Sequence, residues 1–111
     1  MAHRHRNETV YVGVYLARLE LPWARSLKEK RAVVKPVAEK LKARFPVSVA
    51  RLEGLNAHTW EVIGASALSS DAVWLEGLLN SVDAFVRSVA ECRVSASRIE
   101  LAPWPNLDRV E

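Results

Sequence analysis

The sequence predicts an α+β domain in which two helices cover one face of a four-stranded antiparallel sheet. Stretches rich in β-branched and aromatic residues alternate with stretches of helical periodicity, in the order β-α-β-β-α-β. Two split β-α-β units of this kind form the ferredoxin-like sandwich. The chain has 111 residues, of which 50% are hydrophobic, and this suits one domain with a two-layer core.

The first strand and the first helix have the clearest local signals. Residues 9–21, "TVYVGVYLARLEL", are rich in strand-forming residues and alternate in polarity. Ser26 is typical of a helix N-cap, and Glu29 three residues later completes the pattern of a capping box. We therefore expect a helix over residues 26–45, with a kink where Pro36 lacks a backbone donor. Its apolar stripe comprises Leu27, Val34, Ala38, Leu41 and Phe45.

The remaining elements follow from the same kinds of pattern. We expect strands over residues 47–55, 58–68 and 93–101, and a turn at "NA" joins the first two of these. A second helix is expected from a cap at Ser70 or Asp71 to about residue 90. Its predicted core stripe comprises Val73, Leu75, Leu78, Leu79, Val82, Phe85, Val86 and Val89. In this fold the first strand is central, between the third and the fourth.

Both ends of the chain are expected to lie outside the domain, which we place at residues 9–102. Residues 1–8 predict a disordered basic arm, and residues 103–111 form a tail with too much proline to extend the sheet far. The N-terminus has no apolar segment, so we predict no secretory signal, and no apolar stretch reaches the roughly 18 residues of a membrane span. Cys92 is the only cysteine, which excludes an internal disulfide and fits a cytoplasmic protein.

The run "LELPWARSLKEKRAVVKPVAEKLKARFPVSVARLEG" resembles the bacterial YlxP-like family, a domain of unknown function. "SLKEKR" after the first strand and "RFPVSVA" before the second carry the resemblance, and "SSDAVWLE" agrees with it at the second helix. The resemblance covers about residues 10–101 and implies a ferredoxin-like fold in a small cytoplasmic bacterial protein. Genes of such proteins often neighbour those of translation and ribosome-maturation factors, which hints at a ribosomal role. The family supplies no catalytic residues, and this chain departs from it in its basic N-terminal extension and at Trp23.

No group of residues typical of an enzyme is present, so we expect a non-enzymatic protein without cofactor or metal. His3 and His5 lie in the arm, and His58 has no acidic partner close to it in the sequence. Two imidazoles in "HRH" are too few for a structural metal site. Some ferredoxin-like enzymes hydrolyse acyl phosphates with a glycine-rich loop, but the corresponding loop here, "LPWARS", has no glycine. A small acyl or phosphoryl hydrolase is therefore only the third alternative.

Cations are concentrated in the first helix. The segment from Arg25 to Arg44 holds eight cations and two carboxylates. Cations near a helix N-terminus oppose the helix dipole, and a bound phosphate would reverse that penalty. The segment therefore predicts an anion-binding surface, most simply for RNA, although a solvated face that keeps the protein soluble is the alternative. The candidates are Arg25, Lys28, Lys30, Arg31, Lys35 and Lys42; of these, Lys28, Arg31, Lys35 and Lys42 fall within about 60° on a helix.

Strand alternation predicts a second surface, on the sheet face that the helices leave open. This face is apolar at one end and ionic at the other, because the pattern "R-x-E" recurs in three strands. A contiguous exposed apolar patch is typical of an interaction surface, so we expect a homo-oligomer, most simply a twofold dimer. The alternatives are an ordinary solvated face, or a bulged first strand with its valines in the core. The interface candidates are Val12, Val14, Leu16, Arg18, Glu20, Arg51, Glu53, Arg98 and Glu100, to which the second strand adds Val47 and Val49.

The same pattern predicts a register between the first and fourth strands. Because these strands are expected to be antiparallel neighbours, their "R-x-E" pairs can face each other in reverse. Arg18 would then lie near Glu100, and Glu20 near Arg98.

Two functional hypotheses follow from the two surfaces. The first is a non-enzymatic binding protein that contacts RNA or the ribosome through its basic first helix. The alternative is a structural or adaptor protein that binds itself or another protein through the sheet face. A salt-dependent affinity for RNA would separate them.

Overall fold

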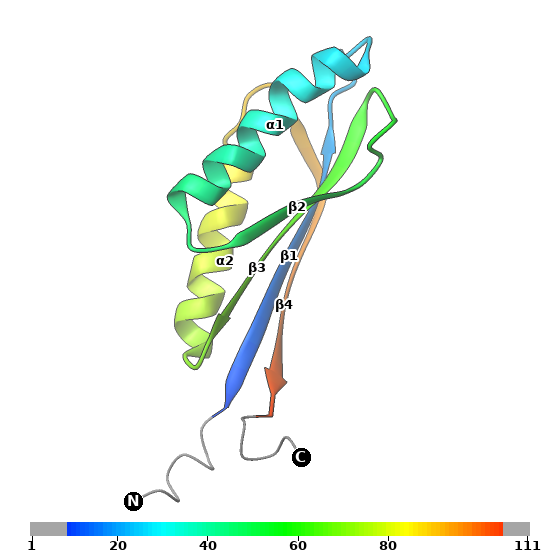
Figure 1. Cartoon of the computed structure of the whole chain (residues 1–111). Helices are drawn as coiled ribbons and strands as arrows, with labels where there is room; N and C mark the ends of the chain where they lie inside the picture. The colour runs from blue at the N-terminus through cyan, green and yellow to red at the C-terminus, as the bar shows by residue number, and fades with distance from the viewer. Residues whose placement is uncertain (1–8, 106–111) are drawn as a thin grey trace, which may run out of the picture.

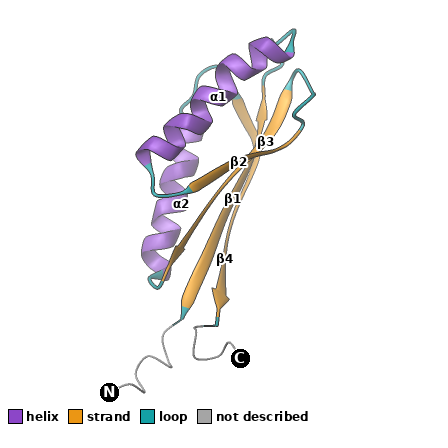
Figure 2. Cartoon of the chain, in the orientation of Figure 1, coloured by secondary structure: helices purple, strands orange, loops and turns teal. Residues whose placement is uncertain are grey.

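A computed structural model describes residues 9–105 and confirms the predicted order of elements. The predicted arm and residues 106–111 of the predicted tail lie outside the described residues. Both helices lie on one side of the sheet, as Figures 1 and 2 show. The four strands are antiparallel in the order β2-β3-β1-β4, so the first strand is central as expected. The elements are β1 (Val10–Glu20), α1 (Leu27–Arg44), β2 (Ser48–Glu53), β3 (Trp60–Ser69), α2 (Ala72–Arg87) and β4 (Arg93–Trp104).

Side-chain caps fix the start of each helix. Ser26 caps α1 and accepts a hydrogen bond from the backbone N–H of Glu29, as the sequence predicts. Asp71, one of the two predicted caps, does the same for α2 by accepting from the N–H of Trp74. The α1 helix continues through Pro36 to Arg44, because the neighbouring turns hold it against the sheet despite the missing donor.

The core lies between the helices and the face of the sheet formed by alternate residues of β1 and β3. Tyr15, Ala17 and Leu19 point into it from β1, and Ile63 and Ala65 from β3. The helices contribute Val34, Val37, Ala38, Leu41, Leu75, Leu79, Val82 and Val86. The prediction for Val73 is wrong: its side chain is 81% exposed, because it lies in the first turn of α2 and points away from the sheet.

The fourth strand is longer than predicted and is paired in a different register. It continues to Trp104, which lies opposite Val10, so two residues assigned to the tail belong to the sheet. Pro103 is tolerated there because β4 is an edge strand, and an edge residue need not donate to a further neighbour.

The predicted pairing of Arg18 with Glu100 is wrong. Glu100 lies opposite Val14, and Arg18 lies opposite Ala96, next to a bulge that contains Ser95. The α2 helix, with 16 residues, returns along the sheet by about 24 Å, or roughly seven strand residues, before β4 begins. The turn between α2 and β4 covers the rest of the distance, and Arg93 lies opposite Glu20. Charge pairing between the "R-x-E" patterns therefore does not set the register.

Candidate binding surfaces

The exposed side of α1 carries most of the predicted anion-binding residues. Arg25, Lys28, Arg31, Lys35 and Lys42 are all exposed, and so are Lys40 and Arg44. Lys42 contacts the carboxylate of Glu39 at 3.5 Å. Within residues 9–105, Lys28, Arg31 and Lys35 form no ion pair with a carboxylate. We call these three side chains the α1 cation row.

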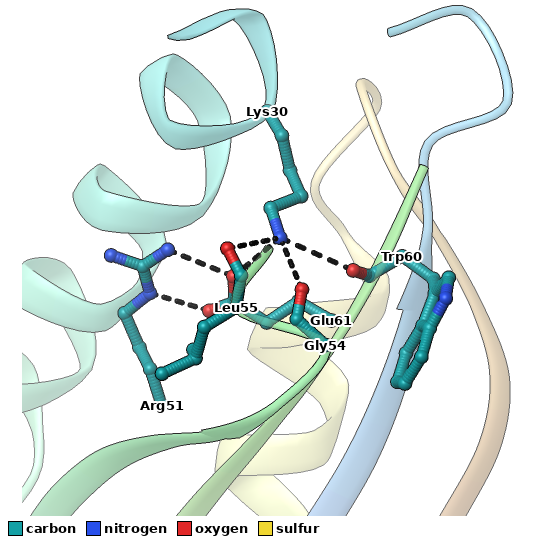
Figure 3. Close-up of polar contacts among 6 residues, drawn as sticks. All are labelled: Lys30, Arg51, Gly54, Leu55, Trp60 and Glu61. Carbon is teal, nitrogen blue, oxygen red and sulfur yellow. Dashed lines mark hydrogen bonds and ion pairs between the residues drawn. The ribbon is translucent and has the colours of Figure 1, made fainter. Parts of the chain in front are cut away.

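Lys30 is not part of that surface, and its assignment as an anion-binding residue is wrong. Its side chain is completely buried and points from α1 toward the hairpin between β2 and β3, as Figure 3 shows. The ammonium group lies 3.0 Å from Glu61 Oε1 and donates to the carbonyl oxygens of Gly54 at 2.7 Å and Trp60 at 3.3 Å. A longer contact of 3.4 Å reaches the carbonyl oxygen of Leu55. Lys30 therefore fastens α1 to the hairpin.

Glu61 is the buried counter-charge that the sequence analysis missed. It occupies a core-facing position of β3, in phase with Ile63 and Ala65. Arg51 holds it with two bonds, Nε to Oε2 at 2.5 Å and Nη2 to Oε1 at 2.8 Å. Burial by itself raises the pKa of the Glu61 carboxyl, but the hydrogen bonds from Arg51 and Lys30 outweigh it and lower that pKa. The signal in the sequence is an acid at an inward position of an alternating strand, which requires a buried cation.

The first turn of α1 is already partly satisfied by side chains. Ser26 accepts from the N–H of Glu29, and the Glu29 carboxylate in turn accepts from the N–H of Arg25 at 2.7 Å. A carboxylate at this position also favours the helix dipole and offsets part of the penalty for the nearby cations. The predicted anion surface of α1 therefore depends on its exposed cations rather than on free backbone N–H groups of the first turn.

The sheet face opposite the helices carries a continuous apolar patch. The predicted residues Val12, Val14 and Leu16 do point to this face, and Val14 and Leu16 are 39% and 36% exposed. Gly64 makes the patch continuous, because the space where a Cβ would lie is taken by Leu52 and Leu16. Leu52 of β2 and Leu68 of β3 extend it, and the sequence analysis missed both. We call Val14, Leu16, Leu52 and Leu68 the outer apolar patch.

Charged side chains border the patch on β1 and β4. Arg18 pairs with Glu20 on its own strand at 2.7 Å, and its guanidinium lies 4.1 Å from the centre of the Trp60 ring. The hydrogen bonds from Arg18 and Ser95 lower the pKa of Glu20. Arg98 and Glu100 likewise pair within β4 and are both exposed on this face. The predicted placement of these four residues on the outer face is confirmed.

Arg51 is placed wrongly in the predicted interface, as are Val47 and Val49. Val49 lies opposite Ala65 and Arg51 opposite Ile63, so both point to the helix side. Val47 packs against the core as well. A bulge between Arg51 and Glu53 then changes the phase of β2, and Glu53 lies opposite Val62 on the outer side.

Of the side chains considered for catalysis, His3 and His5 lie outside the described residues. His58 is exposed in the hairpin, and Cys92 is half-buried between α2 and β4, where burial raises the pKa of its thiol. Within residues 9–105, no three His, Cys, Asp or Glu side chains lie close enough to share a metal ion. No helix in this range is long and apolar enough to cross a membrane.

Comparison with known proteins gives matches over most of the chain. Residues 12–99 match the family model described as "Protein of unknown function (DUF503)". The chain is 35% identical to "Uncharacterized protein YlxP" from Bacillus subtilis (strain 168) over 77 residues, which are 69% of this chain and 84% of that relative. Among solved structures it is similar to the de novo designed protein Foldit4, with a TM-score of 0.43 and 15% identity over 89% of this chain and 99% of that one. The family match includes both helices, all of β2 and β3, and parts of β1 and β4.

Proposed function

The chain belongs to the DUF503 family of proteins of unknown function, and on this premise we propose that it is a non-enzymatic binding protein that contacts RNA through the α1 cation row. The observation that carries the proposal is that Lys28, Arg31 and Lys35 are exposed, lie on one side of α1, and make no ion pair with a carboxylate among residues 9–105. A phosphate interacts most strongly with a cation whose charge is not already neutralised by a carboxylate of the protein.

The length of the row favours a nucleic acid over a small anion. The row itself spans about 10 Å of helix, and Lys42, which contacts Glu39, lies about 21 Å along α1 from Lys28, so that exposed cations extend beyond the reach of one metabolite. Arg25 and Arg44 add charge at the two ends. Genes of this family often neighbour those of translation and ribosome-maturation factors, which favours RNA over DNA as the nucleic acid.

Neutralising the row should weaken RNA binding without disturbing the fold. Each phosphate contact contributes about 0.7–0.9 to the slope of log affinity against log salt. We expect Lys28→Gln/Arg31→Gln/Lys35→Gln to flatten this slope by roughly two to three and to lower the affinity most at low salt. Fluorescence anisotropy with a labelled RNA hairpin at several salt concentrations measures both quantities.

The matched control keeps the charge and changes only the side chains. In Lys28→Arg/Arg31→Lys/Lys35→Arg the slope should remain at the wild-type value, because phosphate attraction here depends on net charge. An unchanged affinity and slope in the neutral variant would refute binding through this surface.

A second function is favoured by a different observation, the outer apolar patch. Two helices cover only one side of a single sheet, so Val14, Leu16, Leu52 and Leu68 are exposed without cover from the described part of the chain. Patches of this kind are typical of association surfaces. We therefore propose that the protein also self-associates through this face, most simply as a twofold dimer.

A further inference from the structure

We infer that the outer sheet face binds the same face of a second copy, about a twofold axis that crosses the strands at the level of Tyr15 and Ile99. The inference rests on the proposed self-association and specifies its geometry. It starts from the observed register between β1 and β4. Val14 lies opposite Glu100, and Leu16 lies opposite Arg98, so Tyr15 and Ile99 mark the midpoint of both pairs.

A twofold axis at that midpoint makes the face complementary to itself. Rotation about an axis between two facing sheets, perpendicular to the strands, reverses the order of residues along each strand but keeps each strand facing its own copy. Arg98 then faces Glu100 of the second copy, and Glu100 faces its Arg98. By the same operation Val14 faces Leu16, so opposite charges meet on β4 while apolar side chains meet on β1.

Known sheet packing allows this arrangement. Sheets that pack face to face lie about 10 Å apart with strand directions within about 30°. The side chains of Arg98 and Glu100 are 72% and 60% exposed and stand on the edge strand, so they can exchange partners between copies without moving the backbone. Gly64 leaves the centre of the face low, and the side chains of Leu16 and Leu52 fill that space.

The charge pattern favours a second copy over an unrelated protein. An unrelated partner would need only an apolar surface, whereas the ordered Arg98 and Glu100 pair beside Val14 and Leu16 matches its own inverted image. Such charge matching sets orientation more than affinity.

Val14→Asp tests whether this face is the interface. The substitution places a carboxylate in the apolar contact, and we expect the dimer dissociation constant to rise by roughly a hundredfold or more. Val73→Asp is the matched control, because Val73 is 81% exposed on α2, away from the sheet face, and should leave the dimer intact. Sedimentation velocity reports the oligomeric state, and circular dichroism confirms that each variant is folded.

Opposite charge reversals test the orientation. Arg98→Glu gives a face with two carboxylates, and Glu100→Arg gives a face with two guanidinium groups. Each variant alone should dimerise roughly tenfold or more weakly, because like charges then face each other. An equimolar mixture should restore association as a heterodimer, and the double variant Arg98→Glu/Glu100→Arg should restore the homodimer.

The outcomes separate the inference from the function on which it rests. Wild-type protein that is monomeric at high micromolar concentration would refute self-association and the geometry together. A wild-type dimer that Val14→Asp leaves intact would keep self-association but overturn this face as its site and point instead to pairing of the β4 edges. A mixture of the two charge variants that stays monomeric would overturn the proposed axis.

Discussion

Lys30→Met should lower the free energy of unfolding by about 3–5 kcal/mol, as expected when one partner of a buried ion pair is removed. The methionine would fill much of the same space, so the loss would come from the missing ammonium group. Glu61 would keep Arg51 but lose its contact at 3.0 Å, and the carbonyl oxygens of Gly54 and Trp60 would be left without this donor. Urea denaturation followed by circular dichroism measures the change.

Lys28→Met is the control for this prediction, because Lys28 is exposed on the same helix two residues earlier. It should change the free energy of unfolding by no more than about 0.5 kcal/mol. Removing both buried partners in Lys30→Met/Glu61→Met should recover part of the lost free energy of unfolding, since no buried charge would then be left without a counter-charge. A loss below about 1 kcal/mol in Lys30→Met would show that its ammonium group is not held out of water.

The two lysines also separate structure from binding. Lys28 belongs to the α1 cation row, whereas Lys30 is turned inward and touches only the protein. At a temperature where both variants are folded, Lys28→Met should weaken RNA binding and Lys30→Met should not. The pair of variants therefore separates the proposed RNA contact of Lys28 from the internal contacts of Lys30.

The features that the sequence predicted well are those that depend on local patterns. Ser26 and Asp71 are helix caps because a short side chain with an acceptor precedes an apolar periodic segment. The phase of β1 was also predictable: Tyr15, Ala17 and Leu19 alternate with Val14, Leu16 and Arg18, and the larger buried set faces the helices.

The features that the sequence did not predict depend on distances between elements. The register of β1 and β4 depends on how far α2 and the turn after it return along the sheet, and no pattern within the strands records that distance. The inward turn of Lys30 depends on Glu61, which is 31 positions away. Arg51 was assigned to the wrong face because a bulge changes the phase of β2 after it, and strict alternation gives no sign of a bulge.

The two proposed surfaces are compatible because they lie on opposite sides of the molecule. The α1 helix, whose cation row is exposed, lies over the inner face of the sheet, whereas the outer apolar patch is on the other face. A dimer formed through the patch would therefore carry its two cation rows on opposite outer sides. Such a dimer could contact two RNA segments, so Val14→Asp should reduce the avidity for long RNA while leaving binding to a short hairpin unchanged.

Glu61→Gln should also be strongly destabilising, but only where the wild-type carboxyl is charged. Glutamine has nearly the same shape as glutamate and still accepts hydrogen bonds. The buried Lys30 ammonium would then contact only neutral oxygens and would have no counter-charge. We expect a loss of about 3 kcal/mol at neutral pH, at the lower end of the range for breaking a buried ion pair. Arg51 is partly exposed and can turn toward solvent, so the loss of its carboxylate partner adds little to the decrease in the free energy of unfolding.

The sign of the pH dependence follows from the lowered pKa of Glu61. A group whose pKa is lower in the folded protein than the ordinary 4.5 contributes its stability in full above that value, and the contribution disappears as the pH falls through the folded pKa. Wild-type protein should therefore lose stability on acidification faster than Glu61→Gln, until the two proteins unfold at similar denaturant concentrations. Other carboxyl groups titrate in both proteins, so the difference between their denaturation midpoints isolates Glu61. A difference that stays constant through the acid range would show that folding does not lower the pKa of Glu61, and a wild-type protein that gains stability relative to Glu61→Gln on acidification would show that the folded carboxyl is neutral.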